Sequence, residues 1–123
     1  MTTYRALSIV APSGSKIARG DKTLEVRRWT PDELPLRDLL IIENDRYLTE
    51  PGATDPAGRA VALVDVVEVS GWRPDQVDEA CASYWEDGWM AWRLENVRSV
   101  AHQGPVVAAR KLYEVDVHLE FSR

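Results

Sequence analysis

The sequence predicts an α+β fold, a small and mostly antiparallel β-barrel of about six strands with two or more helices packed on it. The chain has 123 residues, enough for one domain with its own core and too few for two of ordinary size. Most of its patterned segments alternate as strands do, and only two have helical spacing. We therefore expect residues 1–123 to form a single domain.

The first predicted elements are a strand, a short helix and a second strand. Residues 5–10, "RALSIV", predict the first strand. Ser13 or Ser15 can cap a helix of about two turns that ends at Gly20, because serine accepts backbone N–H bonds and glycine adopts the left-handed conformation at a helix end. Residues 22–28 then alternate between polar and apolar side chains, which predicts a strand with one buried face.

The rest of the chain predicts four more strands and one long loop. Residues 36–44 form an apolar run typical of a buried strand, and residues 60–72 show the strongest strand pattern of the chain. Residues 89–100 and the alternating residues 112–121 predict two more. Between the strands predicted at residues 36–44 and 60–72, residues 44–59 hold two prolines and two glycines and predict a loop. A loop of this length is usually functional or mobile.

Residues 73–85, "RPDQVDEACASYW", predict the second helix. Pro74 stands at its start, where a missing N–H costs nothing, and Val77, Cys81 and Tyr84 fall on one face. Together with the first helix, it would cover the openings of the barrel and protect the strand edges.

Composition predicts a cytoplasmic protein and excludes a membrane-spanning one. The longest apolar run, residues 39–42, is far short of the roughly 20 residues that a membrane helix needs. The N-terminal residues lack the pattern of a signal peptide. Cys81 is the single cysteine, which excludes an internal disulfide and fits a reducing compartment. No pattern in the sequence indicates an oligomeric state.

The net charge of −5 is unevenly distributed along the chain. Residues 1–30 carry six basic and two acidic residues, a net +4, whereas residues 31–90 carry a net −10. A local basic patch can bind phosphate on an acidic protein, because salt screens charges beyond roughly 8–10 Å. A chance cluster on a solvated face is the alternative explanation.

Charged side chains gather in "GDKTLEVRRW", residues 20–29. On a strand, Glu25 and Arg27 stand on the same face as Thr23, and Lys22 lies at the junction with the preceding helix. Such a group can hold a phosphate or a base edge, since arginine makes planar bidentate contacts. It can also carry out proton chemistry, with a lysine beside a carboxylate. An ordinary surface ion pair worth at most about 1 kcal/mol is the third interpretation.

The order "ALSI…P…GDKTLEVRRW…WRLENV…LYEV" resembles the ASCH domain, a small barrel related to the RNA-binding PUA domains. Its signature G-x-K-x-x-E-x-R is filled by Gly20, Lys22, Glu25 and Arg27, and the resemblance runs from about residue 6 to residue 115. It implies a cleft, lined by the motif's side chains, that receives nucleic acid or a nucleotide. Members of the family are linked to RNA binding, transcriptional coactivation, single-strand ribonuclease activity and deacetylation of N4-acetylcytidine.

The chain departs from the family pattern at several places. The amidohydrolase branch has a threonine three residues after the motif lysine, where this chain has Glu25, and Thr23 is only a neighbour. Ser13 replaces the tryptophan that often follows the early proline, and Ala108 and Ala109 replace glycines before the last strand. The family's amidohydrolase mechanism is therefore not supported as it stands.

Other segments could complete the predicted site. A helix beginning near Ser13 and Ser15, with Lys16 close by, could bind phosphate through its free N–H groups, although simple capping is the favoured explanation of the serines. Among the five tryptophans, Trp29, Trp85 and Trp89 are expected to be exposed and able to stack on a base, whereas Tyr84 and Trp92 are expected in the core.

The sequence therefore predicts a protein that binds RNA or a modified nucleoside through this motif. A hydrolase is the alternative, with the lysine and glutamate as an acid–base pair, and an adaptor that binds proteins through the acidic middle segment is the third class. His102 and His118 have no zinc-like spacing, so no metal or other cofactor is expected. The predicted catalytic residues are Lys22, Glu25 and Glu86, and the predicted substrate-binding residues are Arg27, Thr23, Ser13, Ser15, Lys16, Arg28, Trp29 and Trp85.

Overall fold

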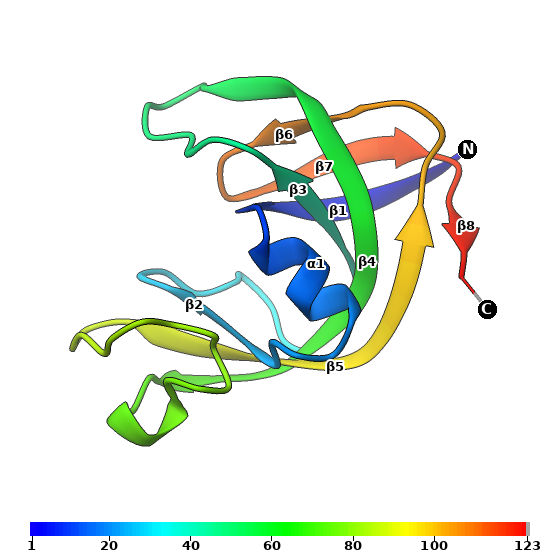
Figure 1. The fold of residues 1–123 in the computed structure, drawn as a ribbon. Helices are drawn as coiled ribbons and strands as arrows, with labels where there is room; N and C mark the ends of the chain where they lie inside the picture. The colour runs from blue at the N-terminus through cyan, green and yellow to red at the C-terminus, as the bar shows by residue number, and fades with distance from the viewer. Residues whose placement is uncertain (123) are drawn as a thin grey trace.

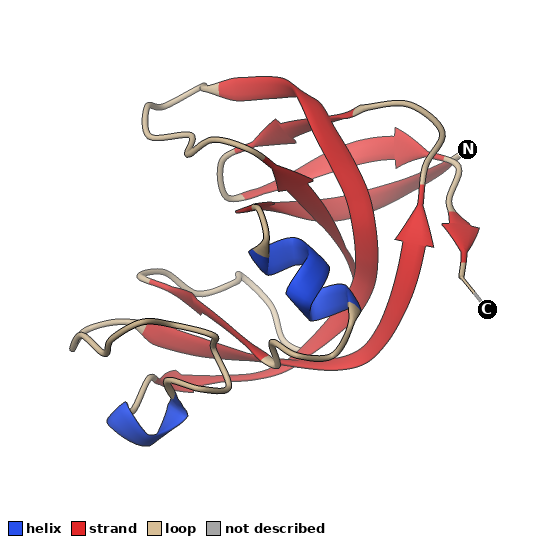
Figure 2. Cartoon of the chain, in the orientation of Figure 1, coloured by secondary structure: helices blue, strands red, loops and turns tan. Residues whose placement is uncertain are grey.

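The structure is a computed structural model that describes residues 1–122. This part of the chain folds into eight strands, one short α-helix and one 3-10 turn (Figure 2). In chain order the elements are β1 (Thr2–Val10), α1 (Ser13–Ala18), β2 (Leu24–Arg27), β3 (Leu36–Asn44), β4 (Thr54–Gly71), η1 (Pro74–Gln76), β5 (Met90–Ala101), β6 (Val106–Ala109), β7 (Leu112–Val117) and β8 (Glu120–Phe121).

The strands form one strongly curved sheet in the order β2-β5-β4-β3-β1-β7, with β6 added to β4 and β8 added to β5. Only β1 and β3 pair in parallel, and the other pairs are antiparallel. Figure 1 shows that β4 and β5 run side by side along the later part of β4 and bend together, whereas the first part of β4 pairs with β6. Two register shifts between them mark bulges, which increase the local bend of a sheet.

The prediction of an α+β barrel with two or more helices is wrong. The molecule is mostly β, and the sheet does not close, because β2 and β7 end the strand order without pairing with each other. Helix α1 lies inside the curve of the sheet, with Ile17 fully buried against the core (Figure 1). In place of backbone pairing, the side chain of Arg27 on β2 reaches across to the carbonyl of Ser8 on β1.

The predicted helix over residues 73–85 is also wrong. The segment contains η1 and a series of turns. Its carbonyl groups bond to another part of the chain: Glu79 O accepts hydrogen bonds from two backbone N–H groups at the start of β2, and Ala80 O accepts one from the Lys22 ammonium. The positive φ of 53° at Cys81 also ends any helical path there. Long-range hydrogen bonds therefore override the local helical spacing.

The core confirms the strand predictions. Both faces of β3 are buried, as its continuous apolar run predicts: Leu40 and Ile42 pack into one apolar cluster, and Leu39 and Ile41 pack into another. Trp92 is fully buried in the second cluster. Tyr84, predicted in the core, is 69% exposed, because the helix that would have buried it does not form.

Two further boundaries differ from the predictions. The loop after β3 covers only residues 45–53, because β4 begins at Thr54. The last predicted strand is divided into β7 and β8. No helix within residues 1–122 has both the length and the apolar character that crossing a membrane requires.

Candidate functional site

A cleft of about 390 Å³ lies where a closed barrel would have joined its edges. One wall comes from β2 and the residues after it, and the other comes from the ends of β1 and β3, the loop after β3 and the turn between β6 and β7. The lining residues are Ser8, Ile9, Val10, Ser13, Glu25, Val26, Arg27, Trp29, Asn44, Arg46, Tyr47, Leu48, Trp89, Ala109, Arg110 and Lys111. The open sheet therefore creates the site.

Three charged side chains of the motif converge on one another beside this cleft, and two of them, Glu25 and Arg27, line it. Arg27 Nε donates to Glu25 Oε2 at 2.8 Å, and Nη2 lies 2.8 Å from the same oxygen and donates to Ser8 O at 2.9 Å. Lys22 Nζ lies 3.3 Å from Glu25 Oε1. Because each carboxylate oxygen of Glu25 faces one cation, the carboxylate is fixed in position between them.

Lys22 lies behind Glu25 and does not line the cleft. Its side chain is 6% exposed, and its ammonium donates to Ala80 O at 2.6 Å in addition to pairing with Glu25. The lysine therefore connects β2 to the segment between β4 and β5. Of the three, only the glutamate and the arginine line the cleft.

Burial of the Glu25 carboxyl raises its pKa, but the Arg27 guanidinium and the Lys22 ammonium outweigh this effect and hold the pKa below the ordinary value of 4.5. Glu25 is therefore an anion at neutral pH. In this state it accepts hydrogen bonds, for example from the amino or imino groups of a base.

The depressed pKa of Glu25 makes the stability of the protein depend on pH. In the unfolded chain the carboxyl binds a proton at higher pH than in the folded one, so the free energy of unfolding is expected to fall as the pH drops below about 4.5. Glu25→Gln removes this titration, and its stability is expected to depend less on pH in that range. Urea unfolding midpoints between about pH 3 and 6 measure the difference. Identical pH profiles for the two proteins would contradict the assignment.

Three further cations line the cleft, and none of them is among the predicted site residues. Arg46 comes from the loop after β3, and Arg110 and Lys111 come from the turn between β6 and β7. Within residues 1–122, neither Arg110 nor Lys111 forms an ion pair with a carboxylate, and both are exposed. Two features of the sequence could have indicated these cations. One is the adjacent basic pair at residues 110 and 111, and the other is the long loop that carries Arg46, which was predicted to be functional or mobile.

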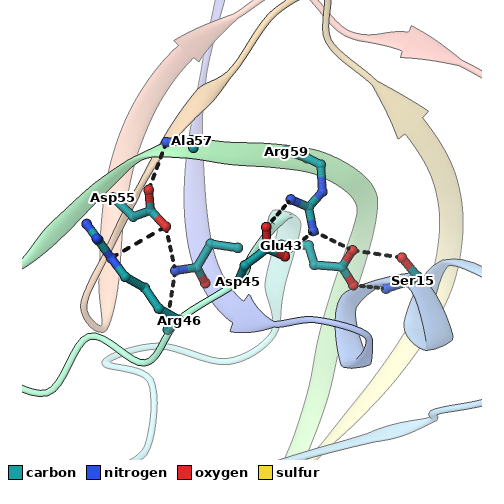
Figure 3. A network of polar contacts seen from close by, with 8 residues as sticks. Ser15, Glu43, Asp45, Arg46, Asp55, Ala57 and Arg59 are labelled. Carbon is teal, nitrogen blue, oxygen red and sulfur yellow. Dashed lines mark hydrogen bonds and ion pairs between the residues drawn. The ribbon is translucent and has the colours of Figure 1, made fainter.

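A network of polar contacts holds the loop after β3 and the start of α1 (Figure 3). Glu43 accepts hydrogen bonds from Ser15 N at 2.7 Å and Ser15 Oγ at 2.9 Å, and it pairs with Arg59 at 3.2 Å. Farther along, Asn44 Nδ2 donates to Arg46 O at 2.7 Å and to Asp55 at 3.3 Å. These contacts fix the backbone from which Arg46 extends to the cleft.

The same network uses the groups that were predicted to bind phosphate at the start of α1. The N–H and hydroxyl groups of Ser15 both donate to Glu43, whose negative charge lies against this end of the helix. Lys16 does not line the cleft, whereas Ser13 does. Of this group, only Ser13 is therefore positioned to contact a ligand in the cleft.

Two tryptophans line the cleft. Trp29 packs edge-on against the buried Trp92 with ring centroids 4.9 Å apart, and Lys111 Nζ lies 5.9 Å from the centre of the Trp29 ring. Trp89 lies under the Arg28 guanidinium, 4.7 Å from its ring centre. Trp85 turns away and donates from Nε1 to Trp72 O at 3.0 Å.

The structure therefore brings only part of the predicted site together. Glu25, Arg27, Trp29 and Ser13 line the cleft, and Lys22 supports it from behind. Among residues 1–122, no group of three or more His, Cys, Asp or Glu side chains could hold a metal ion. The predicted residues that do not line the cleft are Thr23, Ser15, Lys16, Arg28, Trp85 and Glu86.

Comparisons with known proteins agree on one family. The profile of the ASCH domain matches residues 7–103. The crystal structure of ASCH from Zymomonas mobilis is similar in fold, with a TM-score of 0.54 and 19% sequence identity over 84% of this chain and 72% of that one. Crystal structures of two mutants of the Zymomonas protein, serine to alanine and tyrosine to phenylalanine, give TM-scores of 0.51 each, with 14% and 16% identity over 84% of this chain and 72% and 74% of theirs. No curated protein matches the chain.

Proposed function

Because the chain belongs to the ASCH domain family, whose fold is of the PUA-like type, we propose that its cleft binds a nucleotide of single-stranded RNA. The observation that carries the proposal is the composition of the cleft: four cations, two tryptophans and one ionised carboxylate line it. This combination fits a ligand that has an anionic group and a flat polar ring. A free modified nucleoside is the alternative ligand.

The cations supply the phosphate contacts. Arg27, Arg46, Arg110 and Lys111 line the cleft from three separate segments, and Glu25 is the only acidic residue of the lining. Cations therefore outnumber carboxylates in the lining although the whole chain carries −5 and Arg46 also lies 3.8 Å from Asp55. More distant acidic residues have little influence there, because salt screens charges beyond a distance of about 8 Å. Arginine side chains suit phosphate because their planar groups make bidentate contacts.

The tryptophans and Glu25 supply the base contacts. A base stacked on an aromatic ring gains roughly 1–3 kcal/mol, and Trp29 and Trp89 offer two such rings. Glu25 is ionised and accepts hydrogen bonds only, so it favours a base edge that carries N–H groups. The cleft volume lies near the lower end of the range of about 300–1,000 Å³ for small-ligand pockets. It can hold one nucleotide and cannot hold a duplex.

We favour binding over hydrolysis because of the position of Lys22. The hydrolase alternative uses Lys22 and Glu25 as an acid–base pair at the substrate. In the structure the Lys22 ammonium is directed at Ala80 O and Glu25, and the lysine does not line the cleft. Turnover of single-stranded RNA or N4-acetylcytidine that is abolished by Lys22→Ala, in a variant that remains folded, would favour the hydrolase.

The proposal predicts a salt-dependent affinity for single-stranded RNA that depends on Arg110. Arg110→Ala is expected to weaken binding about fivefold and to reduce the slope of log affinity against log salt by about 1, because one phosphate contact is lost. Fluorescence anisotropy with a labelled RNA oligonucleotide at several salt concentrations measures both quantities. Arg110 is exposed and has no ion pair within residues 1–122, so the variant is expected to fold normally.

Arg19→Ala is the matched control for this prediction. Arg19 is also exposed, its loss changes the net charge by the same amount, and it does not line the cleft. Its removal is expected to leave both the affinity and the salt slope unchanged. Equal losses in the two variants would show that RNA responds to overall charge, and absence of RNA binding at low salt would end the proposal.

A further inference from the structure

A second, smaller hollow of about 230 Å³ adjoins the cleft. Val26 and Trp89 line both spaces, so the two hollows lie side by side and share these side chains. The other walls of the second hollow come from the segment between β4 and β5, which was predicted to be a helix. Its lining residues are Val26, Trp72, Ala82, Ser83, Tyr84, Glu86 and Trp89.

The chemistry of this second hollow differs from that of the cleft. Its lining has three aromatic side chains and no cation. Its one carboxylate, Glu86, already accepts a hydrogen bond from Trp89 Nε1 at 3.1 Å and pairs with Arg28 at 3.7 Å. A phosphate would find no cation in this lining. An uncharged, flat and largely apolar group fits it much better.

The aromatic walls are prepared for such a group. Trp89 is held on one face by the Arg28 guanidinium and at its N–H by Glu86, so little side-chain freedom remains to be lost on binding. Tyr84 is 69% exposed and its hydroxyl has no hydrogen-bond partner within residues 1–122. The ring therefore lines the hollow with most of its surface free to contact a ligand.

We propose that this hollow is a second stacking subsite, which takes the base of the next nucleotide of the RNA strand held in the cleft. The proposal rests on the proposed function of the cleft. A single RNA strand alternates charged phosphates with flat bases, and the two spaces offer a cationic and an aromatic environment on either side of Trp89. The chain should therefore distinguish a continuous strand from a free nucleoside or mononucleotide.

Two exposed tyrosines allow a matched test. Tyr84 lines only the second hollow, and Tyr47, 79% exposed, lines only the cleft. Isothermal titration calorimetry measures the affinities of uridine monophosphate and of a uridine tetranucleotide for the wild-type protein, Tyr84→Ala and Tyr47→Ala. Wild type is expected to bind the tetranucleotide more tightly. Tyr84→Ala should weaken tetranucleotide binding about tenfold and leave mononucleotide binding unchanged, whereas Tyr47→Ala should weaken both.

The outcomes separate the subsite from the function of the cleft. The subsite is overturned if the wild-type protein binds both ligands with equal affinity, or if Tyr84→Ala binds the tetranucleotide as tightly as wild type does. In either case, measurable binding of the mononucleotide still supports the proposal for the cleft. A loss for both ligands in Tyr84→Ala also overturns the subsite, because this tyrosine does not line the cleft. If neither ligand binds wild type, both proposals fail. Thermal unfolding confirms that the variants are folded.

Discussion

Lys22→Met is expected to lower the free energy of unfolding by about 3–5 kcal/mol, the usual cost of breaking a buried ion pair by removing one partner. Lys22 is 5% exposed and Glu25 is 6% exposed. Without the ammonium, the carboxylate keeps only Arg27, and Ala80 O loses its side-chain donor. Domains of this size are stable by about 5–15 kcal/mol, so the loss is a large fraction of the total. Urea unfolding measures it.

Lys16→Met is the matched control. Lys16 lies on α1, is half-buried and forms no ion pair within residues 1–122, so its replacement is expected to change stability by less than about 0.5 kcal/mol. Adding Glu25→Gln to Lys22→Met removes the carboxylate left without its ammonium, and should restore part of the loss. If Lys22→Met is as stable as wild type but has lost binding or turnover, the lysine acts on the ligand, and its structural role is wrong.

The strands could be predicted because the order of apolar and polar residues along a strand depends directly on which of its faces are buried. The unbroken apolar run of residues 36–44 predicted a strand buried on both faces, and β3 is such a strand. The start of β4 was missed, because Pro56 and Gly58 made residues 54–59 read as loop. A register shift between Asp55 and Gly58 accommodates the proline in the strand, since a residue at a bulge does not need to donate to the ladder.

The absence of a helix over residues 73–85 and the absence of a closed barrel could not be predicted, because both depend on distant contacts. Carbonyl groups of the segment bond to the start of β2, about 57 residues earlier in the chain, and no local spacing reveals such a pairing. Closure depends on whether two edge strands meet. Here α1 lies inside the sheet, and the Arg27 side chain bonds to Ser8 O across the gap.

The candidate site was predictable only where one strand carries it. The two-residue spacing of Glu25 and Arg27 placed them on one face of a strand, and the structure pairs them at 2.8 Å. Arg46 and Arg110 belong to turns far from this strand in the sequence, and they reach the cleft only because the sheet stays open. The burial of Lys22 could not be predicted either, since the segment that covers it was predicted to be a helix.

Gly58→Ala is expected to cost about 1–3 kcal/mol or more, as overpacking a tight site does. A Cβ at this position would collide with Val106 O, the backbone of the paired strand β6, and would lie 2.7 Å from Ile42 Cγ2. Because one obstacle is backbone and the other is a fully buried side chain, neither can move without shifting the sheet. Chemical denaturation of the variant and wild type measures the loss.

The same substitution should also weaken RNA binding, because β6 leads directly into the turn that carries Arg110 and Lys111. Relief of the collision requires β6 to move away from β4, and this displaces both cations from the cleft. Gly71→Ala is the matched control: a Cβ there meets nothing within 4 Å, so stability should stay the same or rise by up to about 1 kcal/mol, and RNA affinity should not change. If the two alanine variants behave alike, then β6 is not packed against Gly58 as the structure shows, and the position of the basic turn must be set by other contacts.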